Sequence, residues 1–186
     1  MYRLREWNRG DADRLLEAFR WDELAWQEPE VPRTRDDALE WIARCGRLAG
    51  EGDVHGFAVV DGTDRVLGHA QVSVTSRRHG LGWLSYWTHP AEQGRGVASG
   101  GARLVTEFAF DRLDLYRVET GHRVNNPGSC LVAQRAGFRP EGIERAKLRY
   151  GTTRYDTGTH ARLVTDPAEG AVVGVCGAEH AKRGAR

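Results

Sequence analysis

Apolar and polar side chains alternate through the middle of the chain, and this alternation predicts β-strands. Residues 65–75 alternate regularly, a spacing that buries one face of a strand and leaves the other face polar. Residues 54–60 form an earlier apolar run, and the polar segment 61–64 between the two predicts an antiparallel hairpin. A third strand is predicted at 83–88, where Pro90 ends it because proline cannot donate to a sheet ladder.

Apolar residues spaced three and four apart predict helices between these strands. A first helix follows Gly10, and a second begins after the N-cap candidate Thr34 and ends near Gly50. A longer helix starts at about Val97 and has one apolar face. Asn126, which is followed by proline, predicts the N-cap of a shorter fourth helix.

The order of these elements indicates the fold class. Further strands are predicted at residues 2–7, 113–124, 143–150 and 153–163. The helix from Val97 connects two strands, and such a βαβ crossover makes its flanking strands parallel. We therefore expect an α/β (α+β) protein with a mixed, mostly antiparallel sheet of about six to seven strands and flanking helices. Residues 1–165 should form one domain, and the tail 166–186, which lacks any period, should be disordered.

Composition excludes several classes of protein. The chain of 186 residues is 40% hydrophobic and 28% charged, as expected for one globular domain. A net charge of +1 with scattered Lys and Arg gives no basis for nucleic-acid binding. The N-terminus lacks the apolar run of a signal peptide and no stretch is long enough to span a membrane, which predicts a cytoplasmic protein. Three cysteines without a CxxC pair predict neither a disulfide framework nor a metal site.

An aromatic and proline-containing segment, residues 20–34, interrupts the regular pattern. Trp21 and Trp26 lie there among acidic residues. The segment is a structured loop or a short helix, and it serves either as a lid over the core or as one wall of a substrate site.

A glycine-rich turn precedes the helix from Val97. Gly94, Gly96, Gly100 and Gly101 all reduce helix stability, so their use lies in a close approach of the backbone. Backbone N–H groups converge in such a turn, and the positive end of the helix dipole points at the same place. The turn therefore predicts an anion site that is best suited to a phosphate.

Two familiar nucleotide motifs do not fit this turn. The sequence lacks GxxxxGK[ST], and in a G-x-G-x-x-G fingerprint Ser99 would occupy the position of the third small residue. The segment Gln93-Gly94-Arg95-Gly96-Val97-Ala98 instead resembles the Q/R-x-x-G-x-G/A motif of the GNAT superfamily of CoA-dependent N-acyltransferases. Asn126-x-x-Ser129, Gly137-Phe138 and the final hairpin follow in the order typical of its RimJ/RimL-like branch. The resemblance covers roughly residues 2–165.

The resemblance implies a site for acetyl-CoA. Backbone amides of the turn would hold the pyrophosphate, and backbone groups on the preceding strand would pair with the pantetheine arm, which Asn126 would also contact. Asn126 can also be read as a helix cap, and Arg95 either contacts phosphate or faces solvent. The predicted cofactor-binding residues are Tyr86, Trp87, Thr88, Gly94, Arg95, Gly96, Val97, Ala98, Ser99 and Asn126.

The resemblance assigns the catalytic groups less completely. Ser129 matches the position thought to protonate the departing thiolate, although a serine in a first helical turn needs no catalytic role. Attack requires a neutral amine, so a carboxylate, histidine or water must remove a proton. Some relatives use a glutamate where this chain has Leu148. Glu119 is the first candidate base in its place, and a structural role is the alternative.

These features predict an N-acetyltransferase that moves an acetyl group from acetyl-CoA to a primary amine by direct attack. The acceptor is a protein N-terminus or a small-molecule amine, and the enzyme is a monomer or homodimer. A non-catalytic acyl-CoA-binding sensor would keep the turn but lack the acid and base, and the missing glutamate favours it slightly. A nucleotide-binding domain is a third possibility.

Overall fold

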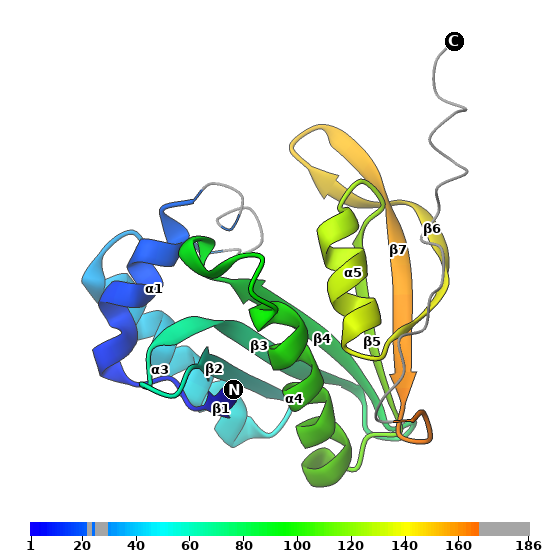
Figure 1. Cartoon of the computed structure of the whole chain (residues 1–186), viewed down its shortest axis with the longest axis horizontal. Coiled ribbons are helices and arrows are strands. Elements are labelled where there is room, and N and C mark those ends of the chain that lie inside the picture. Colours follow the sequence, from blue (N-terminus) through cyan, green and yellow to red (C-terminus); the bar gives the residue numbers. More distant parts are fainter. Residues whose placement is uncertain (22–23, 25–29, 168–186) are drawn as a thin grey trace.

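The computed structural model describes residues 1–21, 24 and 30–167. Its seven strands form one sheet in the order β1-β2-β3-β4-β5-β7-β6 (Figure 1). All neighbouring strands are antiparallel except β4 and β5, which are parallel. The predicted mixed, mostly antiparallel sheet is thereby confirmed. The strands are β1 (Arg3–Arg5), β2 (Val54–Val60), β3 (Val66–Ser76), β4 (Leu81–Thr88), β5 (Arg117–Arg123), β6 (Arg139–Tyr150) and β7 (Thr153–Leu163).

Four α-helices flank the sheet within the described residues, and they divide its hydrophobic core in two. The helices are α1 (Ala12–Phe19), α3 (Arg35–Glu51), α4 (Val97–Leu113) and α5 (Pro127–Arg135). Trp7, Leu15 and Trp41 belong to the core under α1 and α3, whereas Leu84 and Val105 belong to the core under α4 and α5. None of the helices among the described residues is both long enough and apolar enough to cross a membrane.

Local sequence signals set the helix ends. The Thr34 side chain accepts a hydrogen bond from the Asp37 N–H, and the Asp37 carboxylate accepts from the Thr34 N–H, which forms a capping box at the start of α3. Gly52, with a φ of 87°, ends this helix two residues beyond the predicted end. The predicted start of a strand at residue 113 is wrong, because α4 continues to Leu113 and β5 begins only at Arg117.

The parallel strands β4 and β5 separate soon after they begin. Only Leu81–Trp83 pair with Arg117–Glu119, whereas β5 pairs with β7 along its whole length. The Thr120 hydroxyl donates to the Leu84 carbonyl at 3.1 Å, the next contact along the two strands. Beyond this contact the sheet opens between its two halves (Figure 1).

A buried histidine stabilises the core under α1 and α3 only in its neutral form. Trp7 Nε1 donates to His69 Nδ1 at 3.0 Å, and the indole rings of Trp41 and Trp87 lie against the same imidazole. Burial lowers the pKa of His69 from 6.5 to about 4. The imidazole therefore stays uncharged at neutral pH and accepts the indole hydrogen bond.

We expect His69 to make the protein less stable in mild acid. Between these two pKa values the unfolded chain binds a proton that the folded chain does not, so stability falls as the pH drops through 6.5 towards 4. From about pH 7.5 to about pH 5 this residue should account for a loss of about 2 kcal/mol in the free energy of unfolding. Urea unfolding at both pH values should show this loss in the wild type but not in His69→Gln. An equal loss in both proteins would contradict the assignment.

Candidate active site

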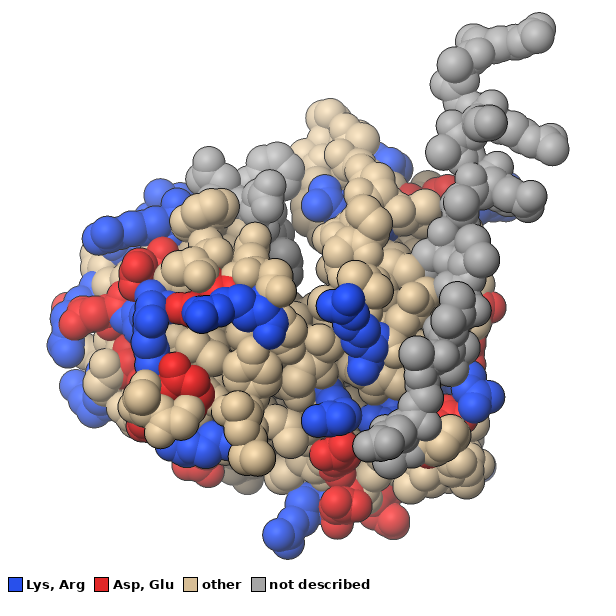
Figure 2. Space-filling view, in the orientation of Figure 1, with Lys and Arg blue, Asp and Glu red and all other residues tan. Residues whose placement is uncertain are grey.

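A cavity of about 430 Å³ lies at the opening between β4 and β5. Its walls come from the end of β4, the glycine turn, the start of α4 and one side of α5, and Figure 2 shows the surface hollowed between the two halves of the molecule. The cavity is lined by Trp21, Leu24, Tyr86, Trp87, Thr88, Pro90, Glu92, Gln93, Gly94, Gly96, Val97, Ala98, Ser99, Asn126, Gly128, Ser129, Leu131, Val132 and Arg135.

The glycine turn presents backbone donors to this cavity. Gly94 and Gly96 have φ values of 75° and 81°, in the left-handed region that side chains disfavour. Gly100 makes the first hydrogen bond along α4, to the Gly96 carbonyl at 2.9 Å, so the earlier N–H groups of the helix lack such a partner. The first turn of α4 also contains no acidic residue. The arrangement suits an anion such as a phosphate.

Most of the predicted site residues lie together around this cavity. Nine of the ten predicted cofactor-binding residues line it, and Ser129 lines it as well. Asn126 is the N-cap of α5, because its Oδ1 accepts from the Ser129 N–H at 3.0 Å. Asn126 also lines the cavity, so the cap is compatible with both predicted roles of Asn126.

Arg95 is the exception among the predicted cofactor-binding residues. Its carbonyl oxygen accepts from the Tyr2 hydroxyl at 2.6 Å, and its guanidinium binds Glu92 at 2.6 Å. The side chain thus lies against the turn and does not line the cavity. Only the backbone of Arg95 belongs to the loop that surrounds the predicted phosphate position.

Glu119, the predicted base, does not lie with the other candidates. Its carboxylate accepts from Arg117 Nε at 2.7 Å, and the residue pairs with Trp83 at the closed end of the opening. It is not among the residues that line the cavity. The geometry therefore gives no support to Glu119 as a base, and that role stays a prediction.

Glu92 is a structural anchor that the sequence patterns did not reveal. It is 2% exposed and binds three guanidinium groups, those of Arg14 at 3.0 Å, Arg65 at 2.9 Å and Arg95 at 2.6 Å. These arginines come from α1, from the turn before β3 and from the glycine turn. One buried carboxylate thus ties the glycine turn to the core under α1 and α3.

Tyr86 contributes a hydroxyl that sequence reasoning also missed, since only its backbone was considered. The hydroxyl donates to the Ser129 carbonyl at 3.2 Å, and burial raises the pKa of Tyr86 to about 12. The phenol therefore keeps its proton at neutral pH. It fixes α5 against β4 next to the Ser129 side chain.

One face of α5 lines the cavity. Gly128, Leu131, Val132 and Arg135 follow the spacing i, i+3, i+4, i+7 and all contact the cavity. This helical spacing was visible in the sequence once the start of α5 was known. Arg135, which is exposed, adds a cation at the rim.

A second group of polar side chains is buried under α5. His122, Cys130 and His160 place their potential ligand atoms within 4.8 Å of one another. Cys130 Sγ lies 3.9 Å from His160 Nε2 and 3.6 Å from Gln134 Nε2. Cys130 is disulfide-bonded, which the cysteine spacing did not predict, so its sulfur is not a free thiolate ligand. We assign no metal to this group, and the expectation of a metal-free protein stays a prediction.

Comparison with known proteins defines the class to which this fold and cavity belong. The profile of the acetyltransferase (GNAT) domain matches residues 2–139. The probable N-acetyltransferase YjcK of Bacillus subtilis (strain 168) is 37% identical over 67 residues, which are 36% of this chain and 37% of YjcK. The chain therefore matches well under half the length of that relative.

Solved structures show the same fold at lower identity. RimJ of Mycobacterium smegmatis, in complex with CoA-disulfide, has a TM-score of 0.75 and 21% identity over 88% of this chain and 82% of RimJ. Spermidine N-acetyltransferase of Vibrio cholerae, in complex with CoA and spermine, has a TM-score of 0.73 and 19% identity over 87% of this chain and 95% of that enzyme. The chain belongs to the GNAT acetyltransferase family.

We expect Glu92→Gln to destabilise the protein strongly. The substitution leaves three arginines around a neutral amide, and loss of one partner of a buried ion pair is costly. Because Arg65 and Arg95 are more than half exposed, we expect a loss of roughly 2 to 3 kcal/mol in the free energy of unfolding, measured by urea denaturation.

Glu17→Gln is the matched control. Glu17 also binds Arg14, at 2.7 Å, but its side chain is 54% exposed. Its loss should cost less than about 1 kcal/mol. Similar losses in the two variants would show that Glu92 is worth no more than a surface ion pair.

Proposed function

We propose that the protein is an N-acetyltransferase that moves an acetyl group from acetyl-CoA to a primary amine. The observation that carries this proposal is the opening of β4 from β5 directly onto the glycine turn at the start of α4. A linear donor with a phosphate at one end and a thioester at the other fits such a site. Membership of the GNAT family supports the same donor.

The donor would be held mainly by backbone groups. The N–H groups of the turn and of the first turn of α4 would bind the pyrophosphate. The end of β4, residues 85–88, pairs with β3 on one side and has no β5 partner on the other, so its free backbone groups can pair with the pantetheine arm. Asn126 and Arg135 would complete the donor side from α5.

The chemical step is a direct transfer. The amine nitrogen forms a bond to the thioester carbon, the carbon–sulfur bond breaks, and the thiolate of CoA leaves. Ser129, which lines the cavity, would protonate the thiolate. We propose water as the acceptor of the amine proton, because Glu92 is the only carboxylate among the described lining residues and three arginines already bind it; Glu119 stays the alternative base.

A direct assay separates this enzyme from an acyl-CoA sensor. Calorimetric titration with CoA should show binding, and incubation with acetyl-CoA should release free thiol only when an amine is added. Binding without amine-dependent thiol release would favour the sensor. Absence of CoA binding would reject both readings.

An intracellular donor agrees with the predicted cytoplasmic location, and RimJ as a structural neighbour agrees with the RimJ/RimL-like branch.

The two hydroxyl groups at the cavity should respond differently to removal. Ser129→Ala should lower kcat by about 100-fold, the usual contribution of a positioned general acid. Tyr86→Phe removes one neutral hydrogen bond of about 1 kcal/mol and should cost at most about fivefold. Steady-state kinetics at saturating acetyl-CoA measures both. If the two effects were reversed, the proton donor would be Tyr86. A small effect in both variants would show that water protonates the thiolate.

A further inference from the structure

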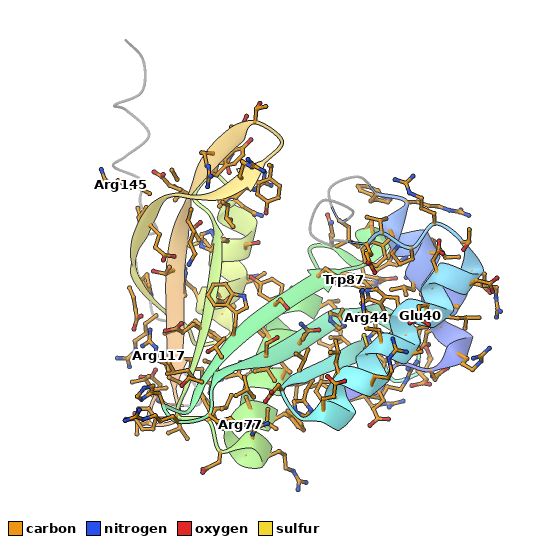
Figure 3. The ribbon with its side chains drawn as sticks, turned by 180° about the vertical axis from the view of Figure 1, so that it is seen from behind. Glu40, Arg44, Arg77, Trp87, Arg117 and Arg145 are labelled. Atoms are coloured by element: carbon orange, nitrogen blue, oxygen red, sulfur yellow. The ribbon has the colours of Figure 1, made fainter. Side chains whose placement is uncertain are left out.

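The face of β5, β7 and β6 that lies opposite α5 carries no helix in the described part of the chain, whereas α1 and α3 cover the same side of the other half of the sheet (Figure 3). Side chains alternate along β5, so Arg123 faces away from His122, which lies with Cys130 of α5. Trp83 lies against Gly121 on the side of Arg123. We define the rear patch as Trp83, Arg123, Lys147, Tyr150 and Tyr155.

Arg123 is held in place by aromatic rings. Its guanidinium carbon lies 4.9 Å from the ring centroid of Tyr150 and 5.3 Å from that of Tyr155, and these two rings meet edge to face. Contact with the two rings restricts the guanidinium and leaves N–H donors available. Among the described residues this guanidinium makes no hydrogen bond and no ion pair.

The carboxylates on the neighbouring strands are already bonded to other groups. Glu119 accepts from Arg117 at 2.7 Å, and Glu144 binds Lys147 at 2.5 Å. Asp156 accepts from the Ala146 N–H at 2.8 Å, and Glu141 binds Arg117. Among the described residues, Arg123 thus makes no ion pair with a carboxylate of the surrounding β-strands.

Arg123 also lies close to the proposed reaction site. It is the last residue of β5, and its carbonyl oxygen accepts from the Asn126 N–H at 2.8 Å. Asn126 and Ser129 line the cavity on the opposite side of the same strand end. Since the backbone pairing of β4 with β5 ends at Trp83 and Glu119, an amine that approaches from the rear patch would meet the proposed donor between the two strands.

We propose that Arg123 selects acceptor amines that carry a carboxylate, an inference that rests on the proposed acetyl transfer. A stacked guanidinium presents a fork of donors that matches a carboxylate in a bidentate manner. The adjoining hairpin, residues 143–156, contains four cationic and two acidic side chains, which also attracts anions. Polyamines, which bring several positive charges to the same surface, are poor acceptors for this protein.

Two pairs of acceptors, whose members differ in one carboxylate, test the proposal. They also show whether the recognised carboxylate belongs to a peptide side chain or to a free amino acid. The first pair is Ser-Asp-Ala-Ala-amide and Ser-Asn-Ala-Ala-amide, two peptides with a free N-terminus and an amidated C-terminus. The second pair is free alanine and alaninamide. Spermidine serves as a cationic acceptor. At saturating acetyl-CoA, kcat/KM for the acidic member of at least one pair should exceed that of its neutral partner about tenfold or more. The pair that responds shows whether the carboxylate belongs to a side chain or to an amino acid.

Variants then assign the preference to Arg123. Arg123→Gln should abolish the preference and leave kcat/KM for the neutral acceptors unchanged, whereas Arg123→Lys should keep part of it as a point charge. Arg149→Gln is the matched control. Arg149 lies opposite Arg154 on the neighbouring strand, and because side chains alternate along β6 it points to the other face of the sheet from Tyr150. This variant should retain the full preference.

Each alternative outcome is distinct. Transfer without preference for a carboxylate, a preference that survives Arg123→Gln, or spermidine as the best acceptor would overturn the inference and leave the proposed function intact. Transfer to no amine at all would reject the proposed function and this inference with it. A dimer in light scattering that only Arg123→Gln dissociates would show that the rear patch binds a second copy of the chain instead.

Discussion

The short stretch of pairing between β4 and β5 is the constraint on which the site depends. Parallel strands that remained paired to their ends would close the sheet and leave no room for a linear donor. Here the pairing stops after Trp83 and Glu119, and β5 continues on β7 instead. The separation exposes the backbone of the last β4 residues on one edge and the start of α5 on the other. The cavity is therefore a consequence of strand pairing and not of any single side chain.

A site built from backbone groups needs a firmly held turn. The positive φ angles of Gly94 and Gly96 give the loop its shape, but they provide no attachment to the rest of the protein. Glu92 provides that attachment, because its buried carboxylate joins arginines from three separate segments. The desolvation of this carboxylate is offset by several charge-assisted hydrogen bonds at once, which is the condition under which a buried charge is tolerated.

Sequence reasoning located the features that local patterns encode. The glycine turn, the caps at Thr34 and Asn126, the hairpins and the crossover all follow from residues near in sequence, and the structure contains each of them. Contacts between distant residues were missed. Nothing near Glu92 in the sequence indicates Arg14 or Arg65, and nothing near Arg95 indicates Tyr2. The misplaced start of β5 has a related cause, since Leu113 to Tyr116 is apolar enough for either a helix end or a strand. Proposals for residues 22–23, 25–29 and 168–186, including Trp26 and the tail, lie outside the described residues.

The same distinction explains why the donor is easier to recognise than the acceptor. The proposed donor side consists of one continuous segment from Tyr86 to Ser99 and one helix start, and both would act largely through backbone atoms, so a short motif describes them. The rear patch combines side chains from β4, the end of β5 and the β6–β7 hairpin, which are up to 72 residues apart between Trp83 and Tyr155. Each of these side chains can change without disturbing the glycine turn. Members of one family can therefore share the donor site and still differ in acceptor, and the acceptor must be inferred from the charges on that surface.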